Sequence, residues 1–339
     1  MIRLDQALSV GSVLLLAQLG GGCAALNPQL VDASVQKPSN VAVYFTVDTR
    51  QGDPVPGLTA EQFHIYEDDK LVSPFESKQT ILNPSVAAMH YTLLLVDMSG
   101  SVTQSGSLPA LEEAAARFTT RVGQYQKTAI YAFDGRPDII PIRGFSSESG
   151  GAGALGSFTT RDPSTNLNGA VIKAIDVLSR QLDRSPVPLR FGTLVVFTDG
   201  TDHAHRVSHD DLMTALDKVP FDVFVIGVGA EIDPGELRAI GRSGAALSKD
   251  PAAVGASFEK IAERIEGYTK RFYLLSYCSP ARAGEHELRV EPFLADGKSG
   301  SLTYQFKADG FGPNCDPNRR PSFDLHHPRR GRGTDAAIR

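Results

Sequence analysis

The sequence of 339 residues lacks an excess of positive charge, since its net charge is −5. Nucleic-acid binding depends largely on basic surfaces that neutralise phosphates, so we expect no nucleic-acid partner. The chain also lacks the Gly-x-Ser-x-Gly, His-Glu-x-x-His and Gly-x-x-x-x-Gly-Lys-Ser/Thr motifs that mark several enzyme classes. We therefore expect no catalytic residues and no enzyme activity. A metal-dependent hydrolase with His203 or His205 as a base near Ser99 is the less favoured alternative.

The N-terminal hydrophobic run is too short to span a bilayer. Residues Leu8–Leu19, preceded by Arg3, have instead the length of a signal-peptide core. The run leads into Gly20-Gly21-Gly22-Cys23, which resembles the lipobox of bacterial lipoproteins, although Leu19 stands one place further from the cysteine than the family prefers. We predict a signal peptide over residues 1–22 and a lipid anchor at Cys23 that attaches an exported protein to a membrane of the bacterial cell envelope. An ordinary signal peptide cut nearby, leaving Cys23 free, is the alternative.

Cysteine is scarce, with three residues in the whole chain. An odd number of thiols in an exported protein needs an explanation. If Cys23 carries lipid, Cys278 and Cys315 remain as a disulfide pair, which an oxidising compartment favours over two unpaired buried thiols. Such a cross-link stabilises a fold by roughly 3–4 kcal/mol in the chain-entropy model.

The sequence patterns of residues 23–85 and 269–339 differ from those of the middle of the chain. Residues 23–40 contain scattered Pro and Ser without periodicity and are predicted to form a tether. Alternating apolar residues over 41–85, and again over 269–312, indicate short antiparallel strands. Because sheets of two or three strands are marginal alone, we expect these two segments to pair into one discontinuous β-sandwich. Residues 313–339 are rich in Arg and Pro and are predicted to be disordered.

The middle of the chain, residues 86–268, alternates between strand and helix patterns. Four nearly continuous apolar runs are typical of strands buried on both faces of a parallel sheet, namely Tyr91–Val96, Thr128–Phe133, Thr193–Thr198 and Val223–Val228. Apolar residues at helical spacing mark helices over 108–122, 167–182 and 254–265. The alternation predicts an α/β fold with a doubly wound, mostly parallel sheet, inserted in the discontinuous β-sandwich.

Polar residues gather in three of the predicted loops. Asp97, Ser99 and Ser101 follow the first buried run, Thr165 precedes a helix, and Asp199 follows another buried run. In an open α/β sheet, ligands bind beyond the carboxyl ends of the strands. Hydroxyl and carboxylate oxygens without thiols suit hard cations such as Mg²⁺. A simpler alternative is that each residue caps a helix or a turn, which explains each loop separately but not their coincidence.

These residues carry a resemblance to a known family. Asp97-x-Ser99-x-Ser101, Thr165 and Asp199 match, in order, the metal-ion-dependent adhesion site (MIDAS) of von Willebrand factor type A domains. The resemblance implies a Rossmann-like sheet wrapped by helices. It also implies that both serines bind the metal directly, that the threonine binds directly or through water, and that both aspartates act mostly through water. The ion would be Mg²⁺, Mn²⁺ or Ca²⁺, and its open position would accept an Asp or Glu carboxylate of a partner protein.

The segments on either side of residues 86–268 extend the resemblance. Gly52-Asp53-Pro54 through Asp68 and the strand Phe272–Tyr277 are similar to those of a group of bacterial exported proteins related to von Willebrand factor. We therefore expect a lipid-anchored adhesion or scaffolding module on the cell envelope. A structural envelope protein with a vestigial metal site is the alternative.

Two further polar features have simpler interpretations. Three histidines cluster just after Asp202, namely His203, His205 and His209, and such a cluster could suggest a zinc site. No Cys or further His is spaced to complete it. We expect these histidines to be solvated residues on the rim of the predicted metal site. Asp134 follows a buried run and is interpreted as a turn residue.

Overall fold

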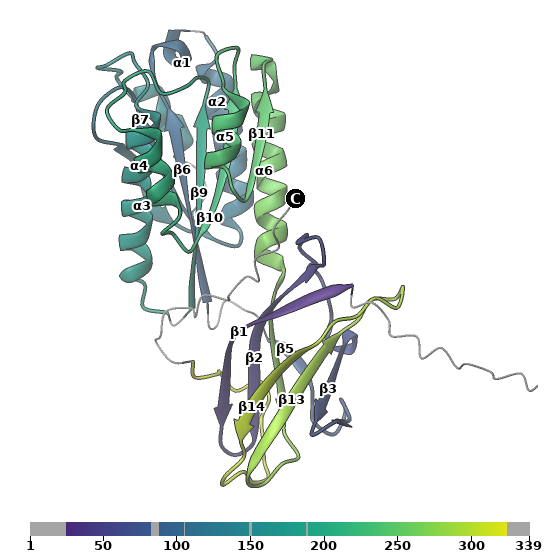
Figure 1. The fold of residues 1–339 in the computed structure, drawn as a ribbon. Coiled ribbons are helices and arrows are strands. Elements are labelled where there is room, and N and C mark those ends of the chain that lie inside the picture. Colours follow the sequence, from purple (N-terminus) through teal and green to yellow (C-terminus); the bar gives the residue numbers. More distant parts are fainter. Residues whose placement is uncertain (1–24, 83–87, 105, 149–150, 188, 324–339) are drawn as a thin grey trace, which may run out of the picture.

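The structure is a computed structural model that describes residues 25–82, 88–104, 106–148, 151–187 and 189–323. Figure 1 shows an α/β unit above a β-sandwich, with the chain passing from the sandwich into the α/β unit and back. The predicted signal peptide and Cys23 lie outside the described residues. In the described part of the chain, no helix has the length and apolarity that crossing a lipid bilayer requires.

The α/β unit is built on a six-stranded sheet with the strand order β11-β10-β9-β6-β7-β8. The strands are β6 (Ala88–Asp97), β7 (Lys127–Phe133), β8 (Ile140–Ser146), β9 (Leu189–Thr198), β10 (Asp222–Val228) and β11 (Gly244–Ser248). All neighbours run parallel except β7 and β8. The predicted fold class is therefore confirmed. The apolar runs did not reveal the edge strands β8 and β11, because half-exposed residues interrupt their apolar pattern.

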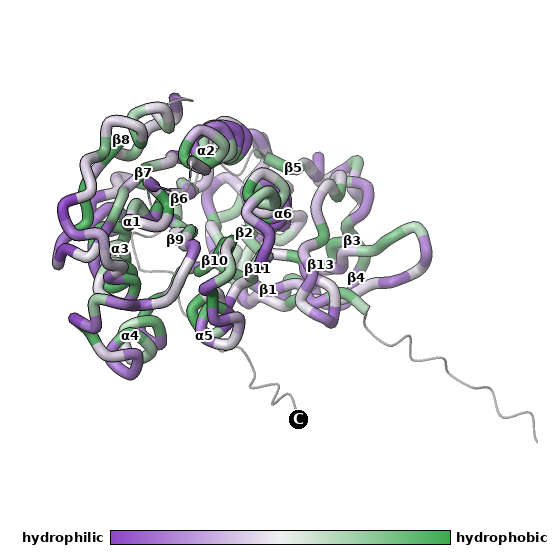
Figure 2. Tube along the Cα trace, turned by 90° about the horizontal axis from the view of Figure 1, so that it is seen from above, coloured by the Kyte–Doolittle hydropathy of each residue, from purple (hydrophilic) through white to green (hydrophobic). Residues whose placement is uncertain are grey.

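Helices cover both faces of this sheet. They are α1 (Gly100–Gln104), α2 (Leu108–Gly123), α3 (Leu167–Asp183), α4 (His209–Leu216), α5 (Pro234–Ile240) and α6 (Val254–Lys270). The described residues also form short 3₁₀ helices, with η1 (Ala60–Gln62) in the sandwich and η3 (Ala152–Ser157) and η4 (Pro251–Ala253) in the α/β unit. Figure 2 shows α2 and α6 on one side of the sheet and α3, α4 and α5 on the other.

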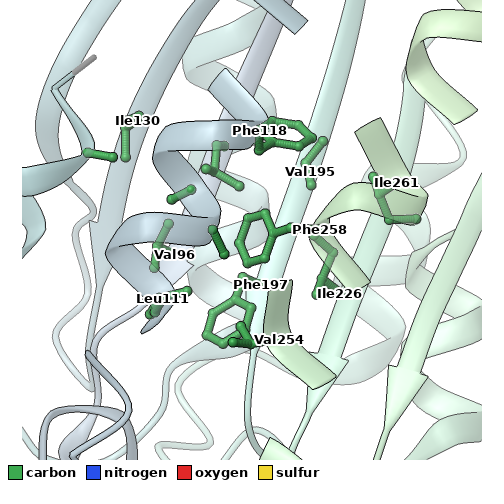
Figure 3. Close-up of a cluster of buried hydrophobic side chains, with 14 of the residues drawn as sticks. Val96, Leu111, Phe118, Ile130, Val195, Phe197, Ile226, Val254, Phe258 and Ile261 are labelled. Carbon is green, nitrogen blue, oxygen red and sulfur yellow. The ribbon is translucent and has the colours of Figure 1, made fainter. Parts of the chain in front are cut away.

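Successive residues of each central strand point to opposite faces and so enter two different cores. On β6, Leu94 and Val96 pack in the core under α2 and α6, whereas Leu93 and Leu95 pack in the core under α3. This two-sided burial explains why the four central strands read as continuous apolar runs. Figure 3 shows the first of these cores, in which Phe258 of α6 packs against strand and helix side chains.

The β-sandwich consists of two four-stranded sheets, β1-β2-β12-β5 and β14-β13-β3-β4. Its strands are β1 (Leu26–Gln36), β2 (Asn40–Thr49), β3 (Phe63–Glu67), β4 (Lys70–Leu71), β5 (Thr80–Leu82), β12 (Phe272–Cys278), β13 (Glu285–Pro292) and β14 (Leu302–Lys307). Strand β12 pairs with β2 and β5, and β13 pairs with β3. Each sheet thus joins strands from both ends of the chain, as predicted for a discontinuous sandwich.

The prediction of a tether over residues 23–40 is wrong for most of its length. Residues Leu26–Gln36 form β1, which pairs antiparallel with β2. Because β1 is an edge strand, it tolerates Pro28, which has no backbone N–H to donate. Pairing with β2 orders this segment, and no apolar periodicity in its own sequence predicts a strand.

The prediction of a disordered tail is wrong for residues 313–323. Cys315 forms a disulfide with Cys278, and the backbone N–H of Ser322 donates to Ser34 Oγ at 3.0 Å. Phe323 is buried, with its ring centroid 6.3 Å from that of Tyr44. Long-range contacts therefore order this segment. Residues 324–339 of the predicted tail lie outside the described residues.

An aromatic junction joins the two units. The ring of Phe191, at the start of β9, lies 4.6 Å from Phe272 and 4.8 Å from His90 between centroids. Burial, aided by the charge of Arg271, lowers the pKa of His90 to about 4, so this imidazole joins the junction as a neutral ring. The amino ends of β6 and β9 meet the sandwich here, and their carboxyl ends point away from it (Figure 1).

We predict that Phe258→Ala lowers the free energy of unfolding by about 3–5 kcal/mol, because it opens a cavity in a closely packed core. Phe258 is 1% exposed, and its ring lies 5.8 Å from Phe118 and 5.5 Å from Phe197 between centroids. Denaturant-induced unfolding measures the loss. The matched control is Phe75→Ala, at a side chain that is 93% exposed, which should change stability by less than about 0.5 kcal/mol. Equal losses for the two variants would contradict the packing described here.

Candidate metal site

The carboxyl ends of β6 and β9 place two loops of the predicted site side by side. The two strands are parallel neighbours, with Val96 opposite Phe197. Asp97 therefore lies beside Thr198, and the hydroxyl of Thr198 donates to Asp97 Oδ2 at 2.7 Å. Asp199 follows directly on the same edge. This is the edge at which open α/β sheets bind ligands.

Hydrogen bonds connect four of the five predicted residues. The backbone N–H of Ser99 donates to Asp97 Oδ1 at 2.9 Å. The hydroxyl oxygens of Ser99 and Ser101 lie 3.2 Å apart, and the Ser101 hydroxyl donates to Asp199 Oδ1 at 2.9 Å. Asp97, Ser99, Ser101 and Asp199 thus form one continuous cluster of oxygen atoms, drawn from the end of β6, the first turn of α1 and the end of β9.

Backbone contacts bring the loop of Thr165 to this cluster. The N–H of Gly100 donates to the carbonyl of Pro163 at 2.9 Å. The carbonyl of Thr165 in turn accepts from the N–H groups of His203 and Ala204, each at 2.9 Å. The loop that carries Thr165 is therefore tied to both of the other loops through main-chain atoms, and the Thr165 side chain is buried.

Exposure differs strongly across the cluster. Asp97 and Ser99 are fully buried, Asp199 is half-buried and Ser101 is exposed. The site thus has a buried floor and an open rim that solvent can reach.

The electrostatics of the cluster favour a cation. Burial, and then the negative charge of Asp199, raise the pKa of Asp97 to about 7, although hydrogen bonds from Thr198 and Ser99 oppose the shift. Burial also raises the pKa of Asp199, and the charge of Glu231 acts in the same direction. Both carboxylates are therefore destabilised in their charged form by burial and by acidic neighbours. A donor set of carboxylate and hydroxyl oxygens with this surplus of negative charge fits a hard divalent cation.

Asp134 supports the loop that carries Thr165, a role that its interpretation as a turn residue only partly anticipated. Its carboxylate accepts from Arg136 Nε and from the N–H groups of Arg136, Arg161 and Asp162. Burial alone would raise the pKa of Asp134, but these hydrogen bonds outweigh it and hold the pKa below its usual range. The sequence signal was its place directly after a buried strand.

Asp202 and Gly229 were missed by sequence reasoning. Asp202 accepts from the N–H of Asn168 at 3.0 Å and from the N–H of His205 at 2.9 Å, which fastens the loop after β9 to the start of α3. A Cβ atom at Gly229 would clash with the carbonyl oxygen of Asp199. Nothing local marks either role, because both depend on contacts between distant loops.

The three histidines stand apart from the oxygen cluster. His203, His205 and His209 each lie near a different carboxylate, at 3.8 Å from Glu231, 3.8 Å from Asp202 and 3.6 Å from Glu236. Their side chains are 55%, 82% and 43% exposed, as expected for residues on the rim. Among the residues that the structure describes, no group of three or more His, Cys, Asp and Glu side chains is arranged to hold a metal. The candidate site differs in kind, because three of its five residues, Ser99, Ser101 and Thr165, contribute hydroxyl groups.

No family model matches the chain, and no curated protein matches it. Several solved structures are similar to it. A von Willebrand factor type A protein from Catenulispora acidiphila is 12% identical with a TM-score of 0.42, over 84% of this chain and 73% of its own. The pilus adhesin SpaC from Lactobacillus rhamnosus GG is 11% identical with a TM-score of 0.42, over 83% of this chain and 48% of its own.

A third similar structure is proximal thread matrix protein 1 from the mussel byssus, with a zinc-occupied MIDAS motif. It is 16% identical with a TM-score of 0.41, over 60% of this chain and 49% of its own. This chain thus spans about half the length of the adhesin and of the mussel protein. At such TM-scores these similarities assign neither a family nor a function to this chain.

We predict that Gly229→Ala weakens binding of Mn²⁺ without removing any predicted ligand. The added methyl group must displace the main chain at Asp199, and overpacking of this kind costs about 1–3 kcal/mol of stability. Calorimetric titration measures the affinity and denaturant-induced unfolding measures the stability.

Gly200→Ala is the matched control, because a Cβ atom at Gly200 would meet nothing within 4 Å. It should bind Mn²⁺ as the wild type does. Wild-type affinity in Gly229→Ala would show that the position of Asp199 does not depend on this close approach.

We predict that Asp97→Asn stabilises the metal-free protein more at about pH 8 than at about pH 5. The folded-state pKa of Asp97, about 7, lies above the usual value of 3.8. The contribution of this group to stability is therefore present at low pH and is lost as the pH rises towards 7. Unfolding in chelator at the two pH values measures the difference between variant and wild type. A difference that is the same at both pH values would contradict the prediction.

Proposed function

We propose that this chain is an exported, non-enzymatic binding module that recognises a carboxylate of a partner protein through a divalent cation. The cation would be held by Asp97, Ser99, Ser101, Thr165 and Asp199. The observation that carries the proposal is the cluster of carboxylate and hydroxyl oxygens with a buried floor and an open rim. A bound cation would offset the negative charge of Asp97 and Asp199 in this cluster.

Each residue has a role that its surroundings support. The hydroxyls of Ser99 and Ser101 would bind the ion directly, and Thr165 would bind directly or through water. Asp97 and Asp199 would act mostly through water and supply negative charge. Hydrogen bonds from Thr198 and from the N–H of Ser99 hold both oxygens of Asp97, so its carboxylate is already oriented. When bound, Mg²⁺, Mn²⁺ or Ca²⁺ would supply an electrophilic coordination position for an incoming carboxylate.

Binding fits the site better than hydrolysis does. Nucleophilic catalysis by serine requires a base within hydrogen-bond reach of the hydroxyl. The hydroxyls of Ser99 and Ser101 contact each other and Asp199, while the nearby histidines lie beside carboxylates. In the described residues, the serines therefore have the partners of metal ligands and not those of nucleophiles.

An exported location is part of the proposal. The disulfide between Cys278 and Cys315 is typical of oxidising compartments. It leaves Cys23 as the one remaining cysteine of the chain, at the end of the predicted signal peptide. We propose that Cys23 is lipidated and that the protein is anchored to a membrane of the bacterial cell envelope.

Calorimetric titration of the full chain with Mg²⁺, Mn²⁺ and Ca²⁺ tests the metal site. We expect one saturable site that Asp97→Ala abolishes and that Asp176→Ala, an exposed aspartate on α3, leaves intact. A short glycine peptide with a central Asp then tests recognition, with the Asn peptide as its matched control. The Asp peptide should bind in Mn²⁺ and not in chelator. Binding of metal without binding of the Asp peptide would contradict carboxylate recognition, and absence of metal binding would favour a vestigial site in a structural envelope protein.

A further inference from the structure

A cavity of about 510 Å³ lies beside the candidate metal site. It opens where α3, α4 and the start of α5 approach one another, and it shares two loops with the metal site. Thr201 and Asp202 belong to the loop that begins with Asp199, and Asn168 lies in the helix that follows Thr165. The full lining is Asn168, Thr201, Asp202, His205, Val207, Ser208, His209 and Glu236.

The lining is rich in hydrogen-bond acceptors and acidic. Asp202 and Glu236 contribute carboxylates, and in the described part of the chain no Lys or Arg lines the cavity. The carboxylate of Asp202 already accepts from two backbone N–H groups. Glu236 is less occupied: its Oε1 lies 3.6 Å from His209 Nδ1, beyond hydrogen-bond distance, and its side chain is 21% exposed. Glu236 is therefore the carboxylate that is available to an incoming group.

Asn168 provides an independent sign that a ligand enters. This lining residue is 5% exposed, and its Nδ2 donates to the carbonyl of Val207 at 3.1 Å. Its Oδ1 is buried without a hydrogen-bond partner. Buried polar atoms are nearly always paired, so Asn168, a residue of the cavity lining, has an acceptor left over for a further donor. A ligand that complements this acceptor and the Glu236 carboxylate would carry hydrogen-bond donors and positive charge.

We propose that this cavity is a subsite for a basic side chain of the same partner protein whose carboxylate binds at the metal site. The inference rests on the proposed function and adds the chemistry of the partner. An arginine guanidinium fits best, because it presents five N–H donors and no acceptor, whereas a lysine ammonium presents three. The partner would then carry an acidic and a basic side chain on one surface, and both would be needed for full affinity.

Peptide titrations test the subsite with the full chain in Mn²⁺. The probes are glycine peptides with a central Asp and an Arg placed at successive distances on either side of it. Each Arg peptide is compared with a citrulline peptide, which keeps the shape and removes the charge. We expect at least one Arg peptide to bind about tenfold more tightly than its citrulline counterpart, as charge-assisted hydrogen bonds allow. A Lys peptide of the same spacing should gain less.

Two variants test whether the higher affinity for the Arg peptide arises in the cavity. Glu236→Gln should abolish the preference for Arg over citrulline while leaving unchanged the affinities for Mn²⁺ and for the peptide with Asp alone. Asn168→Ala should reduce the same preference. Glu263→Gln is the matched control, since this glutamate on α6 is 63% exposed and does not line the cavity.

The outcomes separate this inference from the proposed function. Equal affinity for Arg and citrulline peptides at every spacing overturns the subsite, as does a preference that survives in Glu236→Gln. If the peptide with Asp alone fails to bind in Mn²⁺, the proposed function itself is wrong and the subsite falls with it. The wild-type titration with that peptide distinguishes the two failures.

Discussion

Strands β6 and β9 pair in parallel at the centre of the sheet, from Ala88 opposite Leu189 to Val96 opposite Phe197. This pairing brings Asp97 and Asp199 to one edge, although they are far apart in sequence. The hydrogen bond from Thr198 to Asp97 then locks the two strand ends together. The other loops attach to this pair, through Gly100 and Pro163 on one side and through Thr165 and His203 on the other. The candidate site depends on this strand pairing because the other loops attach to the paired ends of β6 and β9.

Placing two carboxylates at a buried strand edge has an electrostatic consequence. Burial and mutual repulsion raise the pKa of Asp97 to about 7, so the site is destabilised as it stands at neutral pH. A divalent cation would offset both effects at once. A basic group in the neighbouring cavity would instead offset the charge of Glu236, so both proposed sites would take up positive charge.

The β-sandwich and the candidate metal site lie at opposite ends of the central strands. The sandwich lies at the amino ends of β6 and β9, behind the aromatic junction of Phe191, Phe272 and His90. Arg271, between α6 and β12, pairs with Asp48 of the sandwich at 3.1 Å and lies 4.6 Å from the ring of Tyr268. The chain therefore crosses between the units at a closely packed point, and the metal-site edge is left pointing away from the sandwich (Figure 1).

The sequence by itself determined the central strands, because a strand buried on both faces must be apolar along its whole length, as Leu93–Val96 shows. It also indicated the candidate cation ligands Asp97, Ser99, Ser101, Thr165 and Asp199, because each lies beside the end of a recognisable strand or helix. Only the tertiary structure decided the order of β1 and of residues 313–323, whose partners lie far away in the chain. It alone revealed that Asp202 fastens two loops, that Gly229 must be small, and that Asn168 Oδ1 faces no donor. Those properties depend on contacts between residues that are far apart in the chain, and local sequence patterns do not show which distant residues come into contact.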